Sequence, residues 1–324
     1  MSTTDPHFPV FDLRKLARRE VEGLARACGE PGLFYVENHG VDVTEIEALA
    51  RLSRAFFAWG LERKLALRME LGGRAWRGYF PLGRELTSGQ PDGKEGLYFG
   101  QQLSDDDPRV RASTPLHGSN LYPALAGFAE RVEGYMTQLE RVGQTLLRAI
   151  AQSLGLRDDA FERRISADPL LLFRIFHYPG DSKTTFGVGA HSDYGLLTLL
   201  WQDGIGGLQV LPPNSQHWID APPRPGTFVC NLGDMMERLT GARCHSITHR
   251  VTTPVGENRI AMPFFMDPGF DTELDPLLPP AGDISEDARR RWDGEDVHAF
   301  EGTYGDYLLG KVGRVFPHLR DNVL

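Results

Sequence analysis

The sequence contains little cysteine and no long apolar segment. Three cysteines, Cys28, Cys230 and Cys244, occur among 324 residues, and no two of them have CxxC spacing. An odd number of isolated cysteines, with no secretory apolar region after Met1, argues against a disulfide framework or a zinc cluster and indicates a reducing, cytoplasmic location. The most apolar run, residues 196–201, is far shorter than the roughly 20 residues that span a bilayer. We therefore expect no insertion into a membrane.

Positive charge is also scarce relative to negative charge. The chain carries 35 Lys and Arg against 44 Asp and Glu, a formal net charge of −9 at pH 7. Because nucleic-acid binding normally requires a basic surface, we expect no nucleic-acid partner. No Walker or dinucleotide-binding glycine motif is present either. With 41% hydrophobic and 24% charged residues, the composition is that of a globular protein with a substantial core.

Apolar and turn-forming residues predict a β-rich region flanked by helices. Residues 170–266 form short apolar segments separated by Gly, Pro, Asn and Asp, which is typical of a sandwich or jelly roll. Residues 72–120, rich in Gly, Pro and polar residues, are expected to form long loops over a site and no packed element. The other expected elements are strands at 8–13 and 32–40 and helices at 15–28, 42–70 with an interruption near Gly60, 121–154 and 300–315.

Two histidines and an aspartate form a candidate metal site. His191 and Asp193 are separated by one residue, so in an extended strand they point to the same side. His249 falls on the apolar face of the alternating segment 246–253. For either histidine alone, a hydrogen-bonded core histidine is the better interpretation. Together, and with Arg259 following, the three match the facial triad of non-heme Fe(II) oxygenases, which leaves coordination positions open for cosubstrate and O2.

Several segments of the sequence also occur in a recognisable order. They are Gly32-Leu-Phe-Tyr-Val-Glu-Asn-His-Gly40, Arg77-Gly-Tyr79, His191-Ser-Asp-Tyr-Gly-Leu-Leu197, Gly207-Leu-Gln-Val210, Trp218-Ile-Asp220, Asn231-Leu-Gly-Asp234, His249-Arg-Val251 and Arg259. The series resembles the isopenicillin N synthase-like branch of the 2-oxoglutarate/Fe(II)-dependent dioxygenases over nearly the whole chain. The resemblance implies a mainly β fold with flanking helices, built on a double-stranded β-helix, or jelly roll, with iron at its open end.

The resemblance also implies an organisation within one structural unit. Residues 1–120 would be the N-terminal non-heme dioxygenase region of helices, strands and active-site loops, and 121–169 a long helical segment. Residues 170–270 would be the Fe(II)/2-oxoglutarate jelly-roll core, and 271–324 a C-terminal closing segment.

By position, His191, Asp193 and His249 match the family's catalytic iron ligands. Arg259 matches the arginine of its Arg-x-Ser motif, which pairs with the distal carboxylate of 2-oxoglutarate, and Tyr178 matches a tyrosine that can reach a carboxylate. A half-buried core tyrosine is an equal alternative for Tyr178. The implied reaction couples oxidative decarboxylation of 2-oxoglutarate to hydroxylation, desaturation or cyclisation of a small molecule. An intact carboxylate at Asp193 disfavours halogenation.

One position departs from the family pattern. The serine that follows the motif arginine by two residues is Ala261 here, so a hydroxyl normally shared with the distal carboxylate is missing. Losing one neutral donor costs about 1 kcal/mol, which weakens the motif without abolishing it. Two alternatives stay open: an Fe(II) oxidase of the same fold that does not use 2-oxoglutarate, and a non-catalytic jelly-roll binding protein. The intact triad argues against the second.

Candidate substrate contacts lie in the loop segment and on the strand after Arg259. An arginine beside aromatic residues would suit a small substrate that bears a carboxylate. An ion pair between Arg77 and an acid such as Glu95 is at least as good an explanation of that arginine. The candidates are Arg77, Tyr79, Tyr98 and Phe265.

Overall fold

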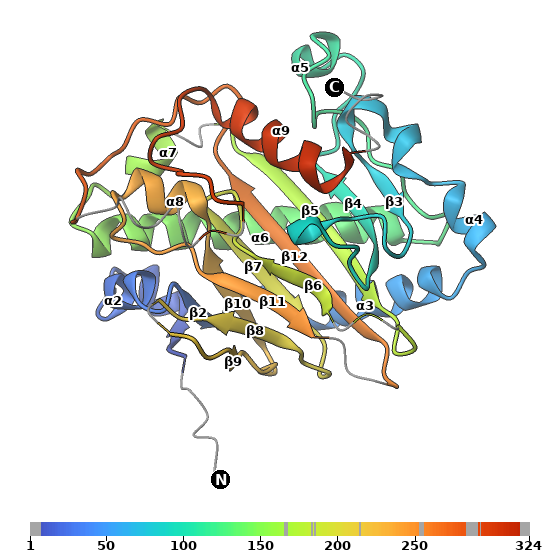
Figure 1. Ribbon diagram of the computed structural model, residues 1–324, viewed down its shortest axis with the longest axis horizontal. Coiled ribbons are helices and arrows are strands. Elements are labelled where there is room, and N and C mark those ends of the chain that lie inside the picture. The colour runs from blue at the N-terminus through green and yellow to red at the C-terminus, as the bar shows by residue number, and fades with distance from the viewer. Residues whose placement is uncertain are drawn as a thin grey trace.

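The computed structural model describes residues 8–164, 168–182, 184, 186–213, 215–252, 256–282, 291 and 293–317. Two β-sheets face each other, which confirms the predicted jelly roll (Figure 1). The major sheet has the strand order β1-β2-β10-β7-β12-β5-β4-β3, and the minor sheet has the order β6-β11-β8-β9. Among the described pairs of strands, β1–β2 is parallel and the others are antiparallel.

The short strands predicted between residues 170 and 266 are present. The strands of the major sheet are β1 Val10–Asp12, β2 Leu33–Glu37, β3 Gly78–Phe80, β4 Glu95–Gly100, β5 Leu170–Tyr178, β7 Leu197–Gln202, β10 Thr227–Leu232 and β12 Arg259–Asp267. Those of the minor sheet are β6 Phe186–His191, β8 Leu208–Leu211, β9 Ile219–Asp220 and β11 Thr248–Thr252.

Helices cover the outer face of the major sheet and one end of the space between the sheets. The long helix α6 runs behind the major sheet and packs against β7 and β12 (Figure 1). It approaches closely at Gly143, where a Cβ atom would lie 2.6 Å from the sulfur of Met266 on β12. The described helices are α1 Leu13–Leu16, α2 Leu24–Gly29, α3 Val43–Phe57, α4 Leu61–Leu65, η1 Met69–Ala75, η2 Thr87–Gly89, α5 Pro108–Arg111, α6 Phe128–Ser153, α7 Ala160–Arg164, α8 Asp234–Leu239 and α9 Tyr304–Val315.

The prediction that residues 72–120 form loops without a packed element was wrong. This segment contributes β3 and β4, which extend the major sheet beyond β5, and every residue of β4 is buried. Its polar composition was misleading because charged side chains here are buried with partners. Glu95 of β4, for example, accepts from Lys64 of α4 at 2.7 Å and from Tyr79 of β3 at 2.5 Å.

The predicted helix at 15–28 is two short helices, α1 and α2. Arg19 and Gly23 between them have φ values of 70° and 76°, in the left-handed region that an α-helix does not use. The helix predicted at 121–154 begins only at Phe128, after Gly127 with φ 73°. The interruption near Gly60 is confirmed, because α3 ends at Phe57 and α4 starts at Leu61. The four-part division of the chain stays a prediction.

Glu95 offers a test of the buried polar contacts that hold β4 in place. Burial raises the pKa of Glu95, but hydrogen bonds from His177, Lys64 and Tyr79 outweigh it and leave that pKa lowered. We expect Glu95→Gln to reduce the free energy of unfolding by about 3 kcal/mol, because Lys64 then keeps a buried charge without a counterion. Urea denaturation at neutral pH measures this. Glu47→Gln, on the exposed face of α3, is the control, and equal stability of the two variants would contradict the expectation.

Candidate metal centre

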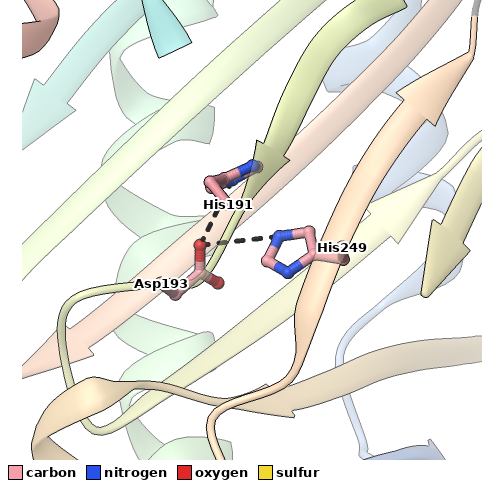
Figure 2. Close-up of side chains that lie close together, drawn as sticks. All are labelled: His191, Asp193 and His249. Carbon is pink, nitrogen blue, oxygen red and sulfur yellow. Dashed lines mark ion pairs between the residues drawn. The ribbon is translucent and has the colours of Figure 1, made fainter. Parts of the chain in front are cut away.

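Adjacent strands of the minor sheet bring His191 and His249 together. His191 ends β6 and pairs directly with His249 of β11. Asp193 lies in the loop that follows β6, and its Oδ1 is 3.7 Å from His191 Nε2 and 3.6 Å from His249 Nε2. The three side chains point toward one another (Figure 2). All three candidate ligand atoms lie within 4.8 Å of one another, so one ion can reach them together.

Hydrogen bonds on the far side of each ligand fix its orientation. His191 Nδ1 lies 2.9 Å from the carbonyl oxygen of Gly189, and His249 Nδ1 lies 3.1 Å from that of Ile247. A proton on each Nδ1 would be donated to that carbonyl, which leaves the Nε2 lone pair directed at the centre. The donor set of two imidazole nitrogens and one carboxylate oxygen therefore fits a divalent metal with open coordination positions.

The carboxylate of Asp193 is oriented in the same way. Its Oδ2 accepts hydrogen bonds from Asn231 Nδ2 at 2.7 Å and from the Thr198 hydroxyl, so Oδ1 is the atom that faces the imidazoles. Burial raises the pKa of Asp193, but the two imidazoles and these hydrogen bonds leave it lowered. Burial, and then the neighbouring imidazole, lower the pKa of His191 to about 3. Both groups are thus in the deprotonated forms that bind metals.

A second site lies at Arg259, the first residue of β12. Arg259 is fully buried, and its Nη2 donates to Gln202 Oε1 at 3.1 Å while its guanidinium lies 4.7 Å from the centre of the Tyr178 ring. Its Nε and Nη1 have no hydrogen-bond partner within the described residues. A buried guanidinium with free donors is costly unless an anion completes it. The residues present therefore fit a carboxylate, which Arg can bind through two parallel hydrogen bonds.

The triad and Arg259 open into one pocket between the two sheets. Every second residue of β12, and of β5 from Leu172 onward, faces this pocket, as the alternation of a strand requires. The minor sheet supplies the opposite wall, and α9 with the residue after it supplies apolar side chains at one end. The lining residues are Leu172, Arg174, Phe176 and Tyr178 from β5; Arg259, Ala261, Pro263, Phe265 and Asp267 from β12; Val188, Leu208 and Val251 from the minor sheet; and Leu308, Val312, Val315 and Phe316 from α9 and the residue after it.

Comparison with known proteins decides the family. A model of the 2OG-Fe(II) oxygenase superfamily matches residues 169–268, and a model of the N-terminal region of non-haem dioxygenases in morphine synthesis matches residues 8–125. A "probable iron/ascorbate oxidoreductase" of Dictyostelium discoideum is 45% identical over 96% of this chain and 92% of its own length. The chain belongs to the 2OG-Fe(II) oxygenase superfamily.

Other proteins are similar over nearly the whole chain. A 1-aminocyclopropane-1-carboxylate oxidase of Dictyostelium mucoroides is 36% identical over 95% of both chains. The crystal structure of Neurospora crassa T7H in complex with alpha-KG superposes with a TM-score of 0.77 and 26% identity, over 97% of this chain and 98% of that one. These findings confirm the predicted family, fold and dioxygenase class, with Fe(II) and 2-oxoglutarate as cofactors.

The structure places only part of the predicted site residues of this oxygenase in the pocket. Arg259, Tyr178 and Phe265 line it together with the triad. Arg77 does not line it. Its buried guanidinium donates to the carbonyl oxygen of Leu116 at 2.7 Å, and the suggested partner Glu95 binds Lys64 instead.

The two candidate tyrosines also lie outside the pocket lining. Tyr79 donates to Glu95, and Tyr98 donates to Glu85 at 2.6 Å. Of the two acids only Glu85 lines the pocket, so Tyr98 sits one contact away from it. The structure gives no support to Arg77, Tyr79 or Tyr98 as direct substrate contacts.

Sequence reasoning missed several polar residues that line the pocket of this oxygenase. Strand alternation counted back from Tyr178 would have found Arg174. Asn231, which holds Asp193, was noted only as part of a family segment. The missed polar residues in the pocket lining are Glu85, Thr87, Lys94, Arg174, Ser192, Tyr194, Thr198, Asn231 and Asp267.

Proposed function

We propose that His191, Asp193 and His249 hold Fe(II) and that Arg259 binds the distal carboxylate of 2-oxoglutarate beside Tyr178. The observation that carries this proposal is the convergence of the three ligand atoms, each held from behind by its own hydrogen bond. When bound, the iron supplies the coupling of O2 activation and 2-oxoglutarate decarboxylation to oxidation of a substrate C–H bond. The protein supplies geometry, charge and exclusion of water.

The individual residues have separate tasks. The carbonyl oxygens of Gly189 and Ile247 can each accept a hydrogen bond from Nδ1, which leaves Nε2 of both imidazoles aimed at the metal. Gln202 holds the Arg259 guanidinium so that its remaining donors face the pocket. The ring of Tyr178 covers the same guanidinium. Because these groups are already in place, little reorganisation is needed when the cosubstrate binds.

The substrate is a small organic molecule held in the remaining part of the pocket. Neighbouring structures support this, because T7H has been crystallised with alpha-KG and thymine together, at 26% identity and a TM-score of 0.76. Arg77, the residue that suggested a carboxylate on the substrate, lies outside the pocket lining. Within the described part of the chain no helix has the length and apolarity needed to span a bilayer. A cytoplasmic location stays a prediction from the cysteine content.

Anaerobic titration of the apo protein with Fe(II) and then 2-oxoglutarate tests the proposal. We expect Fe(II) binding followed by the visible charge-transfer band of a keto acid chelated to Fe(II), and succinate release once O2 and a substrate are added. Fe(II) binding without the band, together with O2 consumption but no succinate, would instead favour the oxidase of the same fold. Failure to bind Fe(II) would overturn the proposed site.

Ala261 provides a gain-of-affinity prediction. It faces the pocket two residues after Arg259, where the family serine would add one hydroxyl donor. One neutral hydrogen bond contributes about 1 kcal/mol, so we expect Ala261→Ser to lower the Kd of 2-oxoglutarate about fivefold. Titration of the charge-transfer band measures this. Ala261→Cys, similar in size with a weak donor, is the control, and equal affinities of the two variants would contradict the expectation.

A further inference from the structure

Arg174 is a second arginine of the pocket, distinct from Arg259. It lies on β5, four residues before Tyr178 and on the same face, which separates the two positions by roughly 13 Å along the strand. Its guanidinium carbon lies 4.2 Å from the centre of the Tyr98 ring and 4.7 Å from that of Phe265. Contact with two aromatic rings holds the planar group in a fixed orientation.

The donors of Arg174 are not used by the described part of the protein. No hydrogen bond joins its guanidinium to a described residue, and its Nε is buried without a partner. The carboxylate nearest to it in an ion pair is that of Glu85, with Oε1 4.0 Å from Nη1, which is beyond hydrogen-bond reach. Glu85 is itself engaged, because Tyr98 donates to its Oε1 and Lys94 Nζ lies 2.8 Å from its Oε2.

The other two acids that line the pocket, Asp267 and Asp193, form no ion pair with Arg174 within the described residues. Asp267 accepts from the Tyr304 hydroxyl at 2.6 Å, and Asp193 faces the two imidazoles of the triad. Arg174 thus presents a charged fork of donors to the pocket, with only 16% of its side chain exposed. A largely buried guanidinium without hydrogen-bond partners favours binding of an anion that accepts two hydrogen bonds.

We propose that Arg174 binds a carboxylate of the substrate and thereby selects small carboxylic acids with an apolar body. The apolar body would lie against Leu308 and Val312 of α9 and against Phe316, which line the same pocket. In this arrangement Arg259 binds the cosubstrate and Arg174 orients the substrate toward the triad. This inference rests on the proposed function, because it takes the pocket to be the substrate chamber.

The test compares acids with their neutral amides in the protein loaded with Fe(II) and saturating 2-oxoglutarate, without O2. The probes are phenylacetate, 3-phenylpropionate and octanoate, each paired with the amide of the same carbon skeleton. Calorimetry and the shift of the charge-transfer band report binding. We expect at least one acid to bind about tenfold or more tightly than its amide, because only the acid offers a charged acceptor. Persistence of the band shows that the acid has not displaced 2-oxoglutarate from Arg259.

Variants then assign the preference to Arg174. Arg174→Met should bind acid and amide equally while still forming the charge-transfer band, and Arg174→Lys should keep part of the preference. The control is Arg250→Met, because Arg250 lies 4.0 Å from the Trp218 ring and 4.9 Å from the Phe186 ring but outside the pocket lining. The preference of Arg250→Met for acid over amide should equal that of the wild-type protein.

Three results would overturn the inference: equal binding of acids and amides by the wild-type protein, no binding of any acid at millimolar concentration, or an unchanged preference in Arg174→Met. If Arg174→Met does not form the band, Arg174→Lys decides the question. It must then weaken acid binding and leave amide binding unchanged. Loss of the band in the wild-type protein would instead count against the iron and cosubstrate site, so the two failures are distinguishable.

Discussion

Replacing His249 with alanine is expected to weaken Fe(II) binding by at least about 100-fold and to abolish turnover. Loss of an outer hydrogen-bond partner of a metal ligand already costs about 10- to 100-fold in affinity, and loss of a ligand costs more. His249 is held in place by β11 and by its Nδ1 contact with Ile247. Among the described residues, the candidate ligand group contains only His191, Asp193 and His249, so no other described ligand is at hand to replace it. Anaerobic Fe(II) titration and succinate release measure the two effects.

Two further variants should show smaller losses of Fe(II) affinity than His249→Ala. Asn231→Ala removes a donor to Asp193 Oδ2 and should fall within the 10- to 100-fold range, between the wild-type protein and His249→Ala. His217→Ala, on an exposed loop, should bind Fe(II) like the wild-type protein. Wild-type affinity in His249→Ala would rule out the assigned triad.

Replacing Arg259 with leucine is expected to raise the Kd of 2-oxoglutarate about 10- to 100-fold without changing Fe(II) affinity. Hydrogen bonds to charged groups contribute about 1.5–3 kcal/mol, and each 1.4 kcal/mol corresponds to a factor of ten. Arg259→Lys keeps the charge but loses the bidentate hydrogen bonding of a guanidinium, so its Kd for 2-oxoglutarate should be intermediate. The charge-transfer band, titrated with 2-oxoglutarate at fixed Fe(II), measures the effect.

The matched control for Arg259 is Arg224→Leu. Arg224 lies 4.3 Å from the centre of the Tyr35 ring, a contact similar to that of Arg259 with Tyr178, but it does not line the pocket. Its loss should leave the Kd of 2-oxoglutarate unchanged. If both substitutions raise the Kd equally, the effect comes from general destabilisation and the cosubstrate role of Arg259 fails.

Much of the metal centre could be predicted because its geometry is local. Strand alternation at a spacing of two residues predicted that His191 and Asp193 face the same centre, and they do, although Asp193 lies in the loop after β6 and not in the strand itself. The same alternation placed His249 on the buried face of its strand, and β11 shows that pattern. Only the direct pairing of His249 with His191 across β6 and β11 required the fold, because strand register depends on pairing between distant segments.

The substrate end of the pocket could not be predicted in the same way. Arg77 and Arg174 are both arginines near aromatic residues in the sequence, but their surroundings differ. Arg77 is buried and hydrogen-bonded to a backbone carbonyl, whereas Arg174 lines the pocket between the sheets and makes no hydrogen bond to a described residue. Composition alone does not show which arginine lines the pocket. Both side chains are largely buried, and they differ only in the residues that distant segments place beside them.

From the sequence by itself, the resemblance carried by short segments gave the family and the jelly roll, and residue identity with short-range periodicity gave the candidate ligand set. Tertiary structure alone decided that β3 and β4 join the major sheet, that α9 closes one end of the pocket, and that Arg174 lines it while Arg77 does not. The physical reason is that burial of a charged group depends on partners brought from far along the chain. Lys64, for example, pairs with Glu95, which lies 31 residues further along the chain.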